Sequence, residues 1–153
     1  MIKGLALCAL GTLATIGSAA AQSTAWERNF DQNTDFSGTM TPTNDSFAVF
    51  CPADGHASFV LKAPVFRTTV ADKHSYSVVF AIDGQRHELV MTAHDEDLIY
   101  EAGDLNARNE IERFVEALSQ GKSFTAAARK LGWRAEFSLE GASTALQGIL
   151  NGC

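Results

Sequence analysis

Hydrophobic and polar positions alternate along much of the chain from residue 46 onward, as they do in strands with one buried face. In residues 46–51, for example, Phe47, Val49 and Cys51 share one face. Asp83 and Gly84 separate two such runs, and both residue types tolerate positive φ, so they predict a two-residue hairpin turn. The strands predicted from this pattern are 46–51, 56–62, 74–82, 85–92, 97–101 and 134–140.

The hydrophobic period then lengthens to that of a helix. Four apolar residues recur at helical spacing and predict one amphipathic face: Ile111, Phe114, Val115 and Leu118. Asn106 is the expected N-cap of this helix, and Gly121 the expected first residue beyond it. A second, short helix is expected from Gly141 to Leu150. Residues 122–130 remain open between helix, which their alanines favour, and strand, which their neighbours favour.

These elements predict an α+β fold: an antiparallel, sandwich-like sheet with two short amphipathic helices in the C-terminal third. Residues 46–153 are expected to form one domain. Residues 22–45 are rich in polar and turn-forming residues and are expected to form an N-terminal arm, held to the domain by Trp26, Phe30 and Phe36.

Residues 1–21 have the pattern of a secretory signal peptide. Lys3 is followed by an apolar run, and Ala19 and Ala21 are the small residues that precede a cleavage site, here expected between Ala21 and Gln22. A membrane anchor is the first alternative, but the run is shorter than the ~20 residues that a span needs. A lipoprotein signal at Cys8 is the second, but Leu7 is bulky where such signals have a small residue. We therefore expect a periplasmic or secreted protein without a membrane span in its mature form.

Cleavage would leave two cysteines, Cys51 and Cys153, in an oxidising compartment. A disulfide between them would tie down the last residue of the chain and close a loop of about 100 residues. The alternative is a reactive thiol, but neither cysteine has a neighbouring positive charge that would stabilise a thiolate. We expect the disulfide.

Composition and charge narrow the choice of partners. The chain has 46% hydrophobic and 20% charged residues, which is ordinary for a globular protein. Its net charge is -6 and it has no basic cluster, so we expect neither nucleic acid nor an anionic membrane as a partner. We also expect no cofactor.

Three arrangements of residues in the sequence could form a catalytic or metal site. Residues 94–97, His-Asp-Glu-Asp, together with His87, could ligate a divalent cation, but consecutive side chains on one turn cannot converge on one point. A Ser-His-Asp hydrolase would need a nucleophile elbow, and Ser143, the nearest candidate, belongs to the start of a predicted helix. A Cys51–His56 nucleophile pair conflicts with the predicted disulfide. We expect no catalytic and no metal-binding residues.

Four residues are candidates for contact with a partner. Arg67 lies in a polar stretch after Pro64, and His94 in an acidic turn; a solvated connector is the simpler interpretation of both. Trp26 and Trp133 are of the type enriched at binding hot spots, but each would serve equally well in the core.

The C-terminal part also carries a set of turn and helix-boundary motifs: Ile82-Asp83-Gly84, Leu118-x-x-Gly121, Phe137-x-Leu139-x-Gly141-x-x-x-Ala145-Leu146 and a final Cys153. Over residues 51–153 the chain resembles bacterial periplasmic proteins related to the invasion-associated locus B family and accessory proteins associated with type VI secretion. The resemblance implies pairing of Cys51 with Cys153 and no agreed enzymatic activity. The alanine-rich stretch at 122–130 and the lack of extra cysteine pairs depart from that group.

We therefore expect a non-enzymatic accessory or interaction protein that has a protein partner in the cell envelope and serves an envelope or secretion system. The alternative is an inhibitor or immunity protein against a cell-wall-acting enzyme, because an acidic, disulfide-bridged domain suits a cationic target. A small enzyme with an unrecognised site is the third hypothesis.

Overall fold

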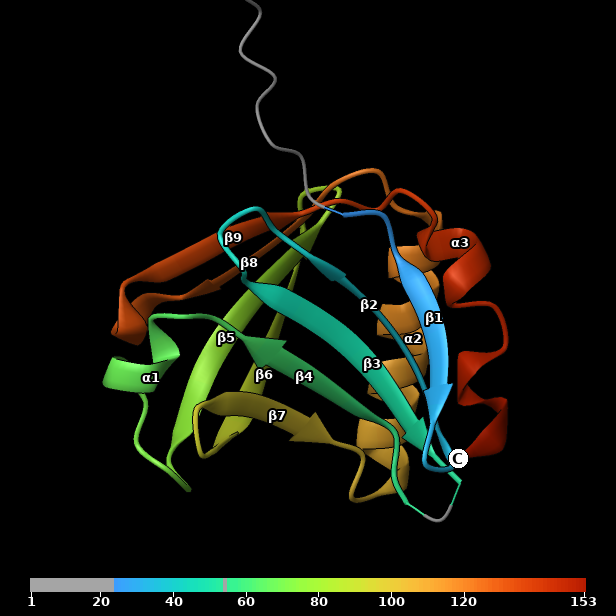
Figure 1. Ribbon diagram of the computed structural model, residues 1–153, viewed down its shortest axis with the longest axis horizontal. Helices are drawn as coiled ribbons and strands as arrows, with labels where there is room; N and C mark the ends of the chain where they lie inside the picture. Colours follow the sequence, from blue (N-terminus) through green and yellow to red (C-terminus); the bar gives the residue numbers. More distant parts are fainter. Residues whose placement is uncertain (1–23, 54) are drawn as a thin grey trace, which may run out of the picture.

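The computed structural model describes residues 24–53 and 55–153, so the predicted signal peptide and its cleavage site between Ala21 and Gln22 lie outside the described residues. Figure 1 shows the described strands as one curved sheet with α2 behind it. The elements are β1 (Glu27–Asp31), β2 (Thr34–Met40), β3 (Ser46–Pro52), β4 (Ser58–Lys62), α1 (Phe66–Thr69), β5 (Ser75–Ile82), β6 (Gln85–His94), β7 (Asp97–Glu101), α2 (Leu105–Gln120), β8 (Phe124–Ala128), η1 (Arg129–Leu131), β9 (Trp133–Phe137), α3 (Ala142–Ala145) and η2 (Ile149–Gly152).

The described residues form one sheet of nine strands in the order β1-β2-β3-β4-β7-β6-β5-β8-β9, and every neighbouring pair is antiparallel. The predicted α+β class with an antiparallel sheet is confirmed. The expected hairpin is also present, with Asp83 at φ 50° and Gly84 at φ 80° between β5 and β6.

An aromatic cluster fills the concave side of the sheet. The ring of Phe47 on β3 lies 5.6 Å from that of Phe80 on β5, 5.1 Å from Phe124 on β8 and 6.1 Å from Phe114 on α2. These rings bring together strands from both halves of the sheet, and burial of large aromatic side chains is a strong driving force for folding. The predicted apolar face of α2 is buried against this cluster.

The boundaries of α2 differ slightly from the prediction. The N-cap is Asp104, whose Oδ1 accepts a hydrogen bond of 2.8 Å from the backbone N–H of Ala107, so the assignment of Asn106 to that position was wrong. A carboxylate two residues upstream competes successfully for the free N–H groups of the first turn. Gly121 follows the helix as predicted, and a Cβ there would lie 2.8 Å from Ile82 Cγ2.

The second expected helix is broken into two short pieces. Residues Ala142–Ala145 form one turn of α-helix, and Ile149–Gly152 form a 3₁₀ turn. Gly148 between them has φ 65°, a left-handed conformation that interrupts a right-handed helix. The open question at 122–130 resolves as a strand, β8, followed by η1. This strand pairs with β5 on one side and β9 on the other, and its alternate residues, beginning with Phe124, are buried.

The segment expected as a polar arm instead forms β1 and β2, two full members of the sheet. The reason lies in the orientation of β2. Its polar residues Ser37 and Thr39 face the interior, while Phe36, Gly38 and Met40 face outward. A strand with this inverted pattern does not give the usual signature of a half-buried strand, because its exposed face is the apolar one.

Both ends of the described part of the chain are fastened to the sheet. The backbone N–H of Trp26 donates to Glu140 O at 2.8 Å, which joins the start of β1 to the segment after β9. A disulfide links Cys51 to Cys153 across 102 residues, with 5.2 Å between their Cα atoms. Arg108 on α2 donates to the carbonyls of Leu150 (2.7 Å) and Cys153 (2.9 Å), so the C-terminal turn is held from two sides.

Within residues 24–53 and 55–153, helices of the length and apolar character needed to cross a membrane are absent.

Candidate functional site

The four residues proposed from the sequence for partner contact occupy different environments. Trp26 and Trp133 are only 5% and 8% exposed. Their indole N–H groups donate to Ser138 O at 2.8 Å and to Asp45 Oδ1 at 2.9 Å, so both side chains are committed to the interior. Arg67 is exposed and pairs with Glu96 at 3.1 Å, and His94 is exposed at the end of β6.

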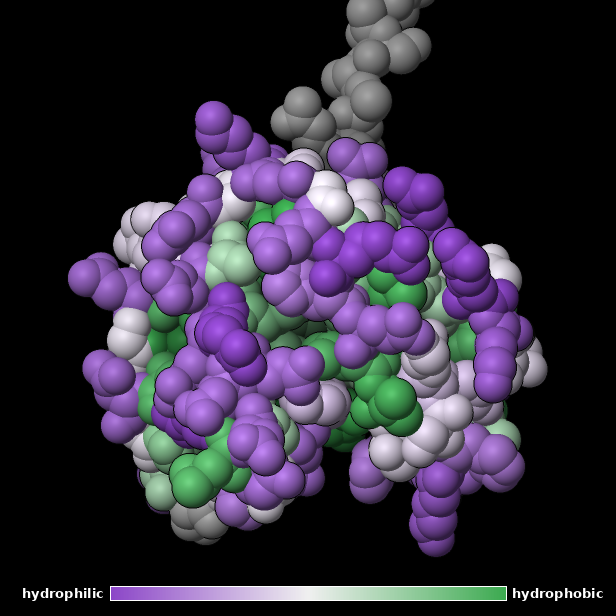
Figure 2. All heavy atoms as spheres, turned by 180° about the vertical axis from the view of Figure 1, so that it is seen from behind, coloured by the Kyte–Doolittle hydropathy of each residue, from purple (hydrophilic) through white to green (hydrophobic). Residues whose placement is uncertain are grey.

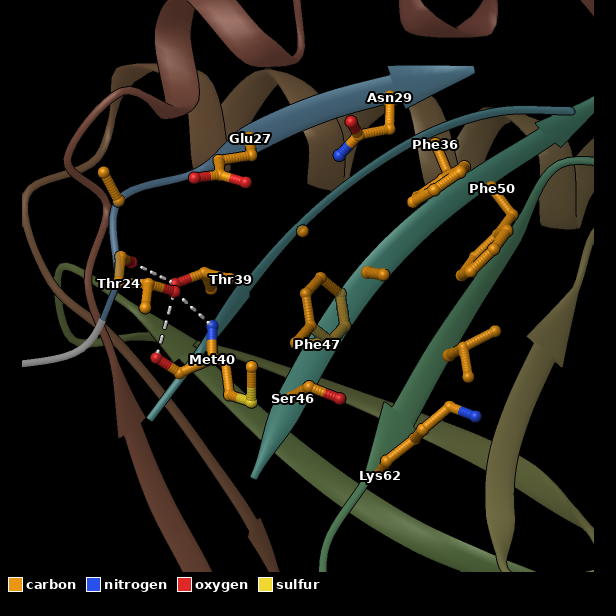
Figure 3. Close-up of a pocket in the computed structure, with 14 residues that line it drawn as sticks. Thr24, Glu27, Asn29, Phe36, Thr39, Met40, Ser46, Phe47, Phe50 and Lys62 are labelled. Carbon is orange, nitrogen blue, oxygen red and sulfur yellow. Dashed lines mark hydrogen bonds between the residues drawn. The ribbon is translucent and has the colours of Figure 1, made fainter. Parts of the chain in front are cut away.

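A more concentrated feature is an apolar groove of about 260 Å³ on the outer, convex face of β1–β4. We call it the outer groove. Figure 3 shows its side chains extending from these strands on the side facing away from α2. Its apolar surface comes from Phe36, Gly38, Met40, Ala48, Phe50 and Val60, and its polar margin from Glu27, Asn29 and Lys62.

Strand register explains the shape of the outer groove. Glu27 pairs with Gly38, Gly38 with Ala48, and Ala48 with Val60, so these residues form one row across four strands. The two small residues at the centre of the row leave a depression. The rows on either side hold larger side chains: Phe36 paired with Phe50 on one side, and Met40, Ser46 and Lys62 on the other. The depression therefore runs across the strands, between two ridges.

The floor of the outer groove cannot be filled by a larger residue at position 38 without local rearrangement. A Cβ on Gly38 would lie 2.8 Å from Phe47 O and 2.9 Å from Ala48 Cβ, closer than ordinary van der Waals contact. The strands β2 and β3 thus approach closely at this point because residue 38 has no side chain.

The first ridge is a pair of aromatic rings. Phe36 and Phe50 stack with 5.3 Å between ring centroids and 13° between ring planes. Met40, from the opposite ridge, is 42% exposed. Phe36 and Phe50 are only partly buried. A contiguous group of large apolar side chains on the solvent face of a sheet marks a binding surface more often than isolated ones do. By contrast, Figure 2 shows a mostly hydrophilic surface on the opposite side of the molecule, with hydrophobic residues scattered in it.

The two charged groups at the margin of the outer groove, Lys62 and Glu27, differ in whether they have an ion-pair partner. Lys62 Nζ lies 2.6 Å from Asp97 Oδ2, so its charge is paired. Among the described residues, Glu27 makes no ion pair and no side-chain hydrogen bond. In Figure 3, Glu27 and Asn29 both extend from β1 along the edge of the groove. The groove therefore combines an apolar floor with one uncompensated carboxylate.

A second, polar pocket lies between β6 and α2, and His87 and Glu110 line it. The hydroxyl of Tyr100 donates to Glu110, and burial together with this carboxylate raises the pKa of Tyr100 to about 12. The ring of His87 packs edge-on against Phe114 with 5.3 Å between centroids. Two carboxylates line this pocket, and each accepts a hydrogen bond: Glu110 from the Tyr100 hydroxyl, and Glu116 from Gln120 Nε2 at 3.3 Å.

Among the residues that line the outer groove, the ionisable ones are Glu27 and Lys62, and the hydroxyl-bearing ones are Thr24, Thr39 and Ser46. In the part of the chain that the structure describes, His, Cys, Asp and Glu residues nowhere gather in a group of three that could hold a metal ion.

The family model YfjT matches residues 24–146, a range that contains all nine described strands and the whole outer groove. The chain belongs to the YfjT family. No curated protein and no solved structure matches it. The groove is thus part of the region that identifies this YfjT-family chain, whereas Cys153 lies beyond the matched residues.

The outer groove of this YfjT-family chain was not predicted from its sequence. A signal was present: Phe36, Gly38 and Met40 alternate with polar residues, and Ala48 and Phe50 make the second face of β3 apolar as well. A strand that is apolar on both faces is covered on both faces, by the core on one side and by a further element or a partner on the other. Recognising that signal required knowledge that residues 34–40 are a strand.

Proposed function

We propose that this protein is an exported, non-enzymatic interaction protein that binds a protein partner through the outer groove. The observation that carries the proposal is the group of apolar side chains on the solvent-facing side of β2–β4, centred on the row Gly38–Ala48. Sheet faces in contact with water alone normally carry polar side chains.

The size of the outer groove supports a protein partner. Pockets for cofactors and drug-sized ligands are generally about 300–1,000 Å³. The outer groove, at about 260 Å³, is smaller and open, and fits one anchoring side chain of a larger partner. Two stacked phenylalanines and a methionine beside it are residue types enriched at protein–protein interfaces.

Export is supported by the signal-peptide pattern of residues 1–21 and by the Cys51–Cys153 disulfide, since such bonds persist in oxidising compartments. An accessory role in the envelope is supported by the resemblance of residues 51–153 to periplasmic accessory proteins. We place the protein in the periplasm or outside the cell.

The test is a pull-down with a variant that fills the outer groove. Ala48→Leu adds apolar volume to its floor and removes no existing contact. Ala127→Leu is the matched control, because Ala127 is a half-buried, outward-facing alanine on β8, far along the sheet from β3. The mature wild-type protein and both variants are cross-linked to native envelope fractions, and the recovered proteins are identified by mass spectrometry.

We expect one dominant partner with the wild type and with Ala127→Leu, and loss of at least about 90% of it with Ala48→Leu, a loss that corresponds to about 1.4 kcal/mol. Circular dichroism of each variant checks that the fold is retained. Equal recovery with Ala48→Leu would overturn the proposal. If the partner is a wall-degrading enzyme that the protein inactivates, the protein is an inhibitor rather than an accessory factor.

A further inference from the structure

We infer that the outer groove receives an arginine or lysine side chain of its protein partner. The aliphatic stem would lie in the depression over Gly38 and Ala48, and the cationic head would reach Glu27. This inference rests on the proposed function and specifies the chemistry of the group that binds.

The depression has the shape of a long, narrow side chain. It runs across the strands from Glu27 through Gly38 and Ala48 to Val60, which is three strand spacings of about 4.8 Å each. Its walls are the Phe36–Phe50 pair on one side and Met40 on the other. An extended chain of methylene groups can contact both walls along this path. Lysine and arginine side chains often cover apolar surface in this way while their charge stays in water.

The charge at the end of the depression determines which side chain fits. Glu27 begins the row, and no cation among the described residues pairs with it. Lys62, the cation that lines the groove, is held by Asp97 at 2.6 Å. The pocket thus offers a free carboxylate and no free cation, so it favours a basic side chain and disfavours an acidic one. The net charge of -6 attracts a basic partner as well.

The carbonyl oxygen of the Asn29 side chain offers a second acceptor. Asn29 follows Glu27 by two residues, so both side chains lie on the same face of β1, and Figure 3 shows both at the edge of the groove. A guanidinium or ammonium group has several N–H donors and can use both acceptors together.

The test uses four blocked tripeptides, acetyl-Gly-X-Gly-amide, with X as arginine, lysine, norleucine or glutamate. Norleucine keeps the aliphatic stem without the charge. Each peptide is titrated at low ionic strength into the isotope-labelled mature protein, and the amide signals of Gly38 and Ala48 are followed by NMR. The variants are Glu27→Gln, Ala48→Leu and the charge-matched control Glu101→Gln, whose side chain lies on the same outer face but on β7.

We expect the arginine and lysine peptides to bind about threefold more tightly than the norleucine peptide, the size typical of an exposed ion pair. Glu27→Gln should reduce them to the norleucine level, Glu101→Gln should leave them unchanged, and added salt should abolish the difference. Ala48→Leu should remove binding of all three. The glutamate peptide should bind most weakly.

Equal affinity of the charged and norleucine peptides, or no effect of Glu27→Gln, would overturn this inference while leaving the groove as a site for apolar side chains. Absence of any peptide-induced shift at Gly38 and Ala48 would also overturn it. The proposed function is judged separately, by whether Ala48→Leu loses the envelope partner.

Discussion

Ser37 is a polar residue of β2 whose side chain faces the core, where apolar side chains are usual. Its side chain is fully buried, and its hydroxyl has no hydrogen-bond partner among the described residues. The neighbouring inward residue Thr39, in contrast, donates its hydroxyl hydrogen to Thr24 O. Two polar side chains of this strand thus face the core of the protein, and of the two only Thr39 has a side-chain hydrogen bond to another described residue.

Ser37→Ala should raise the free energy of unfolding by about 1 kcal/mol, because it removes a buried polar group that has no partner. Thr39→Val is the matched comparison and should lower that free energy by about 1 kcal/mol, because it removes a hydrogen bond and leaves the rest of the side chain in place. Urea denaturation of both variants measures the difference. The same sign for both changes would contradict this account of β2.

Tyr100 should make stability sensitive to alkaline pH. Burial and the carboxylate of Glu110 raise its pKa to about 12 in the folded protein, from an ordinary value of 10.0. A folded-state pKa above the unfolded one means that the folded protein holds the proton more tightly. The contribution to stability is therefore complete below pH 10 and is lost as the pH rises from about 10 to about 12. Tyr100→Phe should flatten this part of the stability profile, and urea denaturation across that pH range measures it.

The control for this prediction is Tyr76→Phe, which removes the second tyrosine of the chain. It should leave the alkaline change in stability in place, whereas absorbance titration of that variant should show the single remaining tyrosine ionising near pH 12. Ionisation near pH 10 would show that Glu110 does not hold the Tyr100 hydroxyl.

At the scale of secondary-structure elements, Asp83 joins the β5–β6 hairpin to the start of β8. Its Oδ1 accepts hydrogen bonds of 2.9 Å from the backbone N–H groups of both Lys122 and Ser123. These two bonds hold the pKa of Asp83 below its ordinary value. One residue therefore forms the hairpin turn and also fixes the connection between α2 and β8.

Asp83→Ala should lower the melting temperature by a few degrees, because alanine loses the side-chain hydrogen bonds to Lys122 and Ser123 and is strained at φ 50°. Asp83→Asn should lower it less, since asparagine tolerates that conformation and keeps an acceptor oxygen. Thermal unfolding at neutral pH compares the two. Equal losses would mean that neither the backbone conformation nor the acceptor at residue 83 matters to the hairpin.

The whole molecule depends on a covalent link between distant parts of the chain. The Cys51–Cys153 disulfide closes a loop of 102 residues and attaches η2 to β3. Cross-linking of this length reduces the entropy of the unfolded chain and stabilises the fold by up to roughly 4–5 kcal/mol.

Cys51→Ser and Cys153→Ser should therefore each lower the free energy of unfolding by a similar amount, up to roughly 4–5 kcal/mol, and the double variant should add little to either. Urea denaturation of the oxidised wild type and the three variants measures this. Losses in the double variant equal to the sum of the single losses would show that the two cysteines act independently.

The strands and helix of the central and C-terminal parts could be predicted from sequence because their apolar residues face the core. The period of Phe47, Val49 and Cys51, and that of Ile111, Phe114 and Leu118, follows directly from burial on one face. The disulfide was predictable for a different reason, the number of cysteines outside the predicted signal peptide. These features depend on local pattern or on counting, and neither requires knowledge of what lies nearby.

Tertiary structure alone decided the role of residues 24–41 and the existence of the outer groove. In β2 the apolar residues face outward, so the usual relation between pattern and burial is reversed, and only pairing with β1 and β3 defines the strand. The groove in turn depends on Glu27, Gly38, Ala48 and Val60 falling in one row across four strands. Strand order and register bring these residues together through long-range pairing, and the sequence near each residue carries no record of its partners on other strands.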